Sequence, residues 1–435
     1  MSDVEDEGNK IGLLDAVAVE VGLIVGGALF GLVGVGVALA GSGVVVSFGI
    51  AITIAVLGLV PTAMLGASFP TTCGHYRYPS RFVSPSLGFV GAFGLGVSMF
   101  AGGLPLYALT AGEYLNGLVA VPVPVTGFAL LTFFFVLNLF GIRPAARAQT
   151  LMFVALVAAL VSFVVLGVPE VEPSNLSSPF SNGFVGIVAG AGVLYFTCLG
   201  ANFVIDIGGD LRDAAVTIPR SFAISIPLVL VLYVLVAAVA VGTVGVSGME
   251  EETLMLPAET FLSPGFMTLF VVGGAVFAVA TSLNAAYILV PRYVEALAHD
   301  GVFPRVLGRK NERFGTAHWA LFGTYALSSL VMLAPLPFED LGTVLAFGGA
   351  LVVTVVMLAV VSVLRQPPAG FDPDAFPVPN RLVLGMAVTA IPLNILLILL
   401  LATQSPTLFA GWLAVLVVGF VYYFVRTNYN KPAQG

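Results

Sequence analysis

Long apolar stretches recur along the chain, and the polar residues between them are few and clustered. A helix that crosses the hydrocarbon core of a bilayer needs about 20 predominantly apolar residues. Runs such as LVLVLYVLVAAVAVG (228–242) are apolar on every side, whereas the strands of a membrane β-barrel alternate with period two. The pattern predicts an all-α membrane protein with twelve spans, at 12–40, 43–68, 86–118, 124–141, 148–168, 183–207, 219–246, 264–298, 317–335, 340–365, 380–403 and 406–426.

Composition agrees with this pattern, because 59% of the 435 residues are hydrophobic and 9% are charged, against about 25% charged in a soluble domain. The acidic start MSDVEDEGNK lacks the basic region of a signal peptide, so we expect a short solvated tail. The chain has no Gly-Lys dipeptide and hence no P-loop. Any transport would then use an ion gradient, an exchanged solute or the substrate's own gradient.

The distribution of charge predicts the orientation, because positive residues gather in cytoplasmic loops. With twelve spans that start inside, all 16 Lys and Arg residues fall on the inner loops and tails. Acidic residues occupy the opposite loops, including Glu170, Glu172, Glu250, Glu339 and Asp340. We therefore expect a multi-pass protein of the plasma membrane with both termini in the cytoplasm.

Two of the predicted spans are unusually rich in glycine. VGLIVGGALFGLVGVG (21–36) has six glycines in sixteen residues, and GAGVLYFTCLGANF (190–203) lies five spans later. Such a pair, at corresponding positions of two halves, marks the binding site of many transporters. Close helix packing through GxxxG spacing, as at Gly22/Gly26 and Gly27/Gly31, is the alternative. The adjacent Gly26 and Gly27 favour a broken helix, since packing needs one glycine per turn.

A helix broken at mid-membrane exposes backbone N–H and C=O groups, which can bind a carboxylate and an ammonium without a charged side chain. The five-span separation predicts a 5+5 inverted repeat with broken helices 1 and 6. The expected organisation is a cytoplasmic tail (1–11), a first repeat (12–168), a second repeat (183–365), two further spans (380–426) and a second tail (427–435).

Four motifs, in order, resemble the amino acid–polyamine–organocation (APC) superfamily of permeases. They are IVGGALFG (24–31), LGASFPTTCGHYRYPSRFVSPSLGFVGAF (65–93), LNLFGIRPAARAQ (137–149) and TSLNAAYILVPRYVEALAHDGVFPRVLGRKNERFGTA (281–317). The resemblance covers essentially the whole chain and implies a leucine-transporter-like fold, an amino acid substrate and alternating access. The chain departs from the family at Met64, where a glutamate is usual, and at YFTCLGAN (195–202) in span six.

The resemblance also implies a substrate site between the two broken spans. The substrate carboxylate would meet the N–H groups of Gly26, Gly27 and Ala28. The ammonium would meet carbonyls of Ile24, Phe196, Thr197 and Leu199, with Phe196 as a gate and with Gly200 and Asn202 beside them. Since Asn202 replaces the family's acid and no span core carries a basic residue, a charged side chain would be costly to bury. We therefore expect a neutral amino acid.

In sodium-driven relatives of this fold a cation lies between the first and eighth spans. Ala278, Thr281 and Ser282 share one helical face, and with the carbonyls of Gly22 and Val25 they would form an all-oxygen site for Na⁺. The alternative is that both hydroxyls bond to carbonyls one turn back. Glu20 is the competing candidate, as a proton carrier, but span five lacks the lysine of some proton-coupled members, which favours sodium.

No other grouping indicates chemistry. The three histidines are scattered over predicted loops, so we expect no metal site, no enzyme activity, no nucleic-acid partner and no cofactor beyond the coupling Na⁺. Asp206 or Asp210 could form an inner-gate ion pair with a nearby arginine. The alternatives left open are another solute, such as a polyamine or inorganic ions as in the cation–chloride cotransporter branch, and a membrane sensor that binds an amino acid without moving it.

Overall fold

The computed structural model describes residues 10–116, 121–198, 200–334, 336–373 and 376–429. Within these ranges the regular structure is helical, and the β pairing consists of two isolated bridges. Eight helical stretches are long and apolar enough to cross a membrane, and Val123–Leu139 and Gly183–Tyr195 are shorter apolar helices. These features support a multi-pass membrane protein. The total of twelve spans and the inverted repeat stay predictions.

Most of the helices fall within the predicted spans, and two short ones, at 74–82 and 255–261, lie in the connections between spans. Their bounds are α2 (Leu13–Ile24), α3 (Gly27–Ala40), α4 (Val44–Ser68), α5 (Gly74–Phe82), α6 (Pro85–Ser98), α7 (Leu104–Asn116), α8 (Val123–Leu139), α9 (Ile142–Gly167), α10 (Gly183–Tyr195), α11 (Ala214–Met249), α12 (Met255–Phe261), α13 (Pro264–Thr268), α14 (Phe277–His299), α15 (His318–Met332), α16 (Phe338–Arg365), α17 (Asn380–Gln404) and α18 (Pro406–Tyr429).

The first predicted span is interrupted between α2 and α3. Val25 has φ −83° and ψ 65°, and Gly26 is extended with φ −85° and ψ −174°. The sixth predicted span is interrupted after α10, where Gly200 has φ 135°, a conformation open mainly to glycine. Its second half differs from the expected α-helix, because it consists of the short 3₁₀ turns η6 (Ala201–Asp206) and η7 (Gly208–Asp210).

Two other helices contain a π-helical segment. The segment η2 (Met99–Gly103) joins α6 to α7, and η8 (Leu269–Val276) joins α13 to α14. Each contains a Gly-Gly pair, and the two lie in the third and eighth predicted spans. Such π segments occur often at functional sites, and their five-span separation supports the predicted repeat without establishing it.

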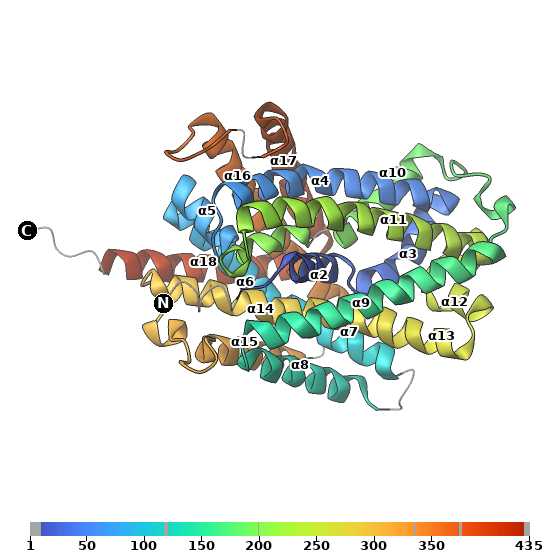
Figure 1. Ribbon diagram of the computed structural model, residues 1–435, viewed down its shortest axis with the longest axis horizontal. Helices are drawn as coiled ribbons and strands as arrows, with labels where there is room; N and C mark the ends of the chain where they lie inside the picture. Colours follow the sequence, from blue (N-terminus) through green and yellow to red (C-terminus); the bar gives the residue numbers. More distant parts are fainter. Residues whose placement is uncertain (1–9, 117–120, 199, 335, 374–375, 430–435) are drawn as a thin grey trace, which may run out of the picture.

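The long helices pack side by side, and α4, α9, α10, α11 and α14 run along the long axis of the view in Figure 1. The helix α10 packs on α3 and α4, while α11 packs on α4 and α2. The helix α14 packs on α9, α7 and α2. One face of α10 is exposed, but the two breaks themselves lie inside the bundle, where Val25 and Thr197 are buried and the freed backbone groups do not face lipid.

Candidate functional site

A cavity of about 630 Å³ lies against both helix breaks. Its wall near the breaks is formed by Ile24, Gly26, Gly27, Thr197 and Gly200, joined by Ser282 from α14. From there the lining continues past Met99 and Tyr107 to Thr253 and Phe338, on connections that the sequence predicts to be extracellular. The volume falls within the usual range for small-molecule sites.

The Tyr233 hydroxyl joins the two breaks. It lies 3.0 Å from the carbonyl oxygen of Ile24 and 3.1 Å from that of Thr197, and it can donate to either. These are two of the carbonyls that the family resemblance assigns to the substrate ammonium. Tyr233 was not among the predicted residues. The signal available was a single tyrosine in an otherwise apolar run of α11, since a buried tyrosine hydroxyl usually has a hydrogen-bond partner.

The glycines of the first span divide into two groups. A Cβ atom added to Gly34 would lie 2.1 Å from the Glu252 backbone, and one added to Gly36 would lie 3.1 Å from Leu194, so these glycines permit close packing. At Gly31 an added Cβ meets nothing within 4 Å, and Gly31 lines the cavity. Close packing also holds at Gly22 and Gly27, where an added Cβ would lie 2.3 Å from Gln149 and 2.7 Å from Val279, whereas the open space at Gly31 contradicts packing there.

The other predicted substrate residues either lie outside the cavity lining or are not fully described by the structure. Asn202 lies outside the cavity lining, and its side-chain nitrogen is 3.2 Å from Nε2 of His75. Leu199 lies outside the described residues, and for Ala28 and Phe196 the structure describes the backbone without the side chain. The substrate contacts of all these residues, and the gating role of Phe196, stay predictions.

The residues predicted to hold Na⁺ surround the end of α2. The Gly22 carbonyl accepts hydrogen bonds from Ser282 Oγ at 2.8 Å and from Thr281 Oγ1 at 3.2 Å. Both hydroxyls also reach the Ala278 carbonyl one turn back, at 3.3 Å and 2.7 Å respectively. Val25, the fifth residue of the predicted set, lies at the break and is buried. These oxygen atoms therefore lie between α2 and α14. The contacts fit both interpretations of the two hydroxyls, as ligands of Na⁺ and as donors to carbonyls one turn back.

Glu20 is fully buried within α2. One carboxylate oxygen accepts a hydrogen bond from Ser221 at 2.6 Å, and the other accepts one from Ser225, both on α11. Within the described part of the chain, two serine hydroxyls satisfy the Glu20 oxygens, and no arginine forms an ion pair with Glu20. The two serines, one turn apart on α11, could not be paired with Glu20 from sequence alone.

A second buried polar group lies beyond the sixth-span break. Asp206 accepts hydrogen bonds from the backbone N–H of His75 at 3.0 Å and from Tyr293, and its Oδ2 lies 2.6 Å from Nδ1 of His75. Both Asp206 and His75 are completely buried. This group connects α5, η6 and α14. The sequence analysis treated His75 as a scattered loop residue, and its burial could not be read from the loop motif.

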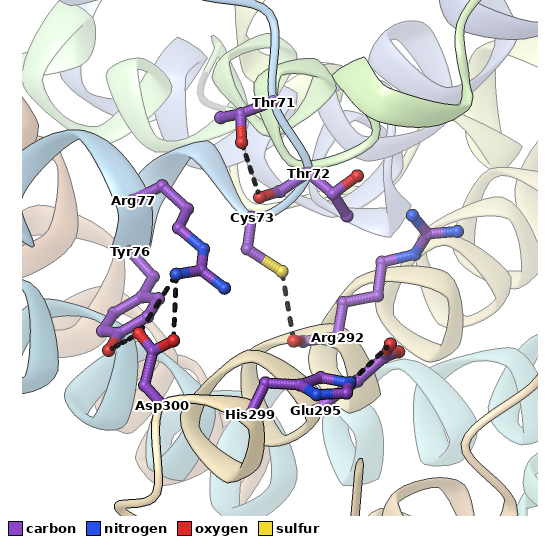
Figure 2. A network of polar contacts seen from close by, with 9 residues as sticks. All are labelled: Thr71, Thr72, Cys73, Tyr76, Arg77, Arg292, Glu295, His299 and Asp300. Carbon is purple, nitrogen blue, oxygen red and sulfur yellow. Dashed lines mark hydrogen bonds and ion pairs between the residues drawn. The ribbon is translucent and has the colours of Figure 1, made fainter. Parts of the chain in front are cut away.

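Ion pairs surround this group on the side that carries the basic loops. Arg292 pairs with Asp210, one of the two acidic residues considered for an inner-gate ion pair, whereas Asp206 contacts His75, and the gating role stays a prediction. In Figure 2, Arg77 and Tyr76 both turn toward Asp300, with Arg77 Nη1 at 3.0 Å and the Tyr76 hydroxyl at 2.6 Å.

Cys73 belongs to the same region and lies beside Arg292. Its thiol donates to the Arg292 carbonyl at 3.1 Å, as Figure 2 shows. Burial raises the pKa of this thiol, with a smaller contribution from Asp206. Cys73 therefore stays protonated at neutral pH and is a structural hydrogen-bond donor, because reactive cysteines need a lowered pKa.

Comparison with known proteins identifies relatives over most of the chain. Residues 11–426 match the family described as amino acid permease. An uncharacterized transporter of Mycobacterium tuberculosis is 29% identical over 72% of this chain and 71% of its own length. The branched-chain amino acid permease of Bacillus subtilis is 24% identical, over 96% and 93%. The chloroplastic cationic amino acid transporter 9 of Arabidopsis thaliana is 26% identical, over 69% and 57%.

The family match spans nearly the whole chain, including both helix breaks and the cavity between them. It confirms the resemblance drawn from the four motifs and indicates a transporter rather than an enzyme. The chain is a multi-pass membrane protein that belongs to the amino acid permease family of the APC superfamily.

Proposed function

We propose that the chain is a secondary active transporter that imports a neutral amino acid across the plasma membrane by alternating access, with Na⁺ as the coupling ion. One observation carries the proposal. Two interrupted helices, 13–40 and 183–210, meet at a single cavity where the carbonyls of Ile24 and Thr197 lie within reach of one hydroxyl group. The ammonium group of an amino acid carries three N–H donors, whereas a hydroxyl group carries one O–H donor, so an ammonium could bond to both carbonyls at once.

The chemistry of the cavity wall supports a neutral side chain on the substrate. Near the breaks the wall consists of backbone, apolar residues and four uncharged hydroxyl-bearing residues, which are Thr110, Tyr114, Thr197 and Ser282. Among the described lining residues the one carboxylate is Glu113, an exposed side chain on α7. A cationic substrate side chain would therefore lose hydration near the breaks without gaining a counter-ion. The relatives carry names for both branched-chain and cationic substrates, so the wall is the better guide.

Uptake into proteoliposomes tests this proposal. We expect radiolabelled alanine, leucine or phenylalanine to be taken up, with each competing better than arginine or lysine. The sodium and pH gradients should be varied independently, so that substrate and coupling ion are determined in one series. Stronger competition by arginine or lysine would contradict the neutral substrate. Binding of an amino acid without uptake would instead identify a sensor.

The sodium site predicts a specific defect for Thr281→Ala. Removal of one oxygen should raise the Na⁺ concentration for half-maximal uptake by about tenfold or more, since even outer partners of a metal site contribute that much. The matched control is Thr324→Ala, because Thr324 is a buried threonine that bonds to the Ala320 carbonyl within its own helix. Equal sodium dependence of the two variants would show that Thr281 only bonds within the helices.

Glu20 remains the rival coupling site, because a fully buried carboxyl group between α2 and α11 is suited to carry a proton. The ion series separates the two proposals. Uptake that does not depend on the pH gradient but is lost when choline replaces sodium would exclude a coupling proton at Glu20. Uptake that persists in choline and follows the pH gradient would contradict the sodium site while leaving the substrate proposal intact.

A further inference from the structure

A second cavity, of about 790 Å³, lies on the side of the basic loops and is not used by the proposed transport site. It is bounded by the start of α9, by α14 and by the connection between α14 and α15. Six arginine and lysine residues line it, together with His299: Arg77, Arg143, Arg147, Arg292, Lys310 and Arg313. Three acidic residues line it as well: Asp210, Glu295 and Glu312.

Ion pairs neutralise part of this basic wall. Arg292 pairs with Asp210, Lys310 pairs with Glu295 at 2.8 Å, and Arg77 pairs with Asp300. Figure 2 shows that Arg77 and Arg292 come from different segments and that Glu295 lies beside His299. In the described part of the chain no acidic group forms an ion pair with Arg143, Arg147 or Arg313, although Glu312 also lines the cavity. The wall therefore carries excess positive charge in a chain of net charge −7.

Arg143 and Arg147 are arranged to bind one anion together. They lie four residues apart near the start of α9, a helix of 26 residues, so they project from the same face. The helix N-terminus adds a positive potential. Both arginines also line a smaller neighbouring cavity of about 300 Å³, together with Lys10, Arg212 and the acidic Asp15. Guanidinium groups bind phosphate oxygens in a bidentate fashion.

An unpartnered hydroxyl group provides an independent indication of a ligand. Tyr287 lines the larger cavity and is 1% exposed, and its hydroxyl has no hydrogen-bond partner among the residues that the structure describes. A buried hydroxyl without a partner is costly, and a phosphate oxygen in the cavity would satisfy it. The positive-inside preference accounts for arginines on this side of the membrane. It does not account for a buried hydroxyl group on the wall of the same cavity.

We propose that this cavity binds a phosphate-bearing anion through Arg143 and Arg147. The shared chemistry is a phosphate group with two or more negative oxygens, supplied either by a soluble phosphate compound or by the headgroup of an anionic lipid. The site is separate from the amino acid cavity, so the proposal does not depend on the transported solute.

Thermal unfolding of the purified full chain tests the soluble source. Inorganic diphosphate should raise the unfolding temperature with a saturable dependence that sodium chloride at equal ionic strength does not reproduce. Arg143→Gln combined with Arg147→Gln should weaken the apparent affinity at least about tenfold. The control is Arg305→Gln with Arg309→Gln, which removes the same charge from exposed residues of the same side that line neither cavity.

Reconstitution tests the lipid source. The same variants are placed in phosphatidylcholine vesicles with and without phosphatidylglycerol, and their unfolding temperatures are compared. A phosphatidylglycerol effect that depends on Arg143 and Arg147 while diphosphate has none would identify a headgroup site. Arg143→Lys with Arg147→Lys keeps the charges that govern insertion and should still lose affinity, because lysine lacks the bidentate geometry. If both glutamine double variants respond equally to both probes, the proposal is wrong.

Discussion

Replacement of Gly31 by leucine is expected to abolish uptake while the protein keeps its thermal stability. Gly31 lines the amino acid cavity, and a Cβ added there meets nothing within 4 Å. A leucine can therefore enter the cavity without displacing a neighbour, and it occupies space that the substrate needs. Leucine also favours a helix over glycine by up to about 1 kcal/mol, so α3 should not be weakened. The measurements are amino acid uptake by proteoliposomes and the unfolding temperature in detergent.

The control for this variant is Gly49→Leu on α4, where an added Cβ likewise meets nothing within 4 Å and no amino acid cavity is lined. Gly27→Leu is a less informative variant, because the new Cβ would lie 2.7 Å from Val279 and the neighbouring helix would have to move. Normal uptake by Gly31→Leu would show that the substrate does not occupy this cavity.

Replacement of Asp206 by alanine is expected to cost at least about 3 kcal/mol of unfolding free energy, because it leaves three buried donor groups without an acceptor, at about 1–3 kcal/mol each. The His75 backbone N–H, the His75 ring and the Tyr293 hydroxyl all bond to this carboxylate. None of these groups can turn to water, because Asp206 and His75 are completely buried. The loss is measured by chemical denaturation in detergent, where the unfolding transition of Asp206→Ala is compared with that of a control variant.

The matched control for Asp206→Ala is Asp300→Ala. Asp300 likewise accepts hydrogen bonds from two other side chains, those of Arg77 and Tyr76. The Asp300 and Arg77 side chains, however, are 33% and 41% exposed. Ion pairs of this kind contribute about 0–1 kcal/mol, so this variant should unfold nearly like the parent. An Asp206 variant no less stable than the Asp300 variant would contradict the importance of the buried group.

Much of the helix arrangement could be predicted because a membrane-crossing helix is defined locally. Its backbone hydrogen bonds are all internal and its side chains must be apolar over a set length. The spans predicted at 340–365 and 380–403 correspond closely to α16 (Phe338–Arg365) and α17 (Asn380–Gln404). The first helix break could be predicted as well, since Gly26 and Gly27 weaken the helix at that point whatever surrounds them.

The partners of buried polar residues could not be predicted, because they depend on contacts between distant segments. Tyr233 reaches Ile24 from 209 residues away, and Glu20 meets Ser221 across 201 residues. The hydropathy of a segment depends only on its own residues, so it does not indicate which helix a polar side chain faces. For the same reason, Asn202 was expected beside the substrate but lies against His75.

The sequence alone determined that the chain crosses a membrane as a bundle of apolar helices, with one break at Gly26 and Gly27, and its motifs indicated the permease family. Local hydropathy, glycine content and short motifs are sufficient for these conclusions. The tertiary structure alone decided that Gly31 faces a cavity, that Asp206 pairs with His75, and that arginines far apart in the chain surround a second cavity. Those properties arise from how helices pack, and packing joins residues whose separation along the chain carries no local signal.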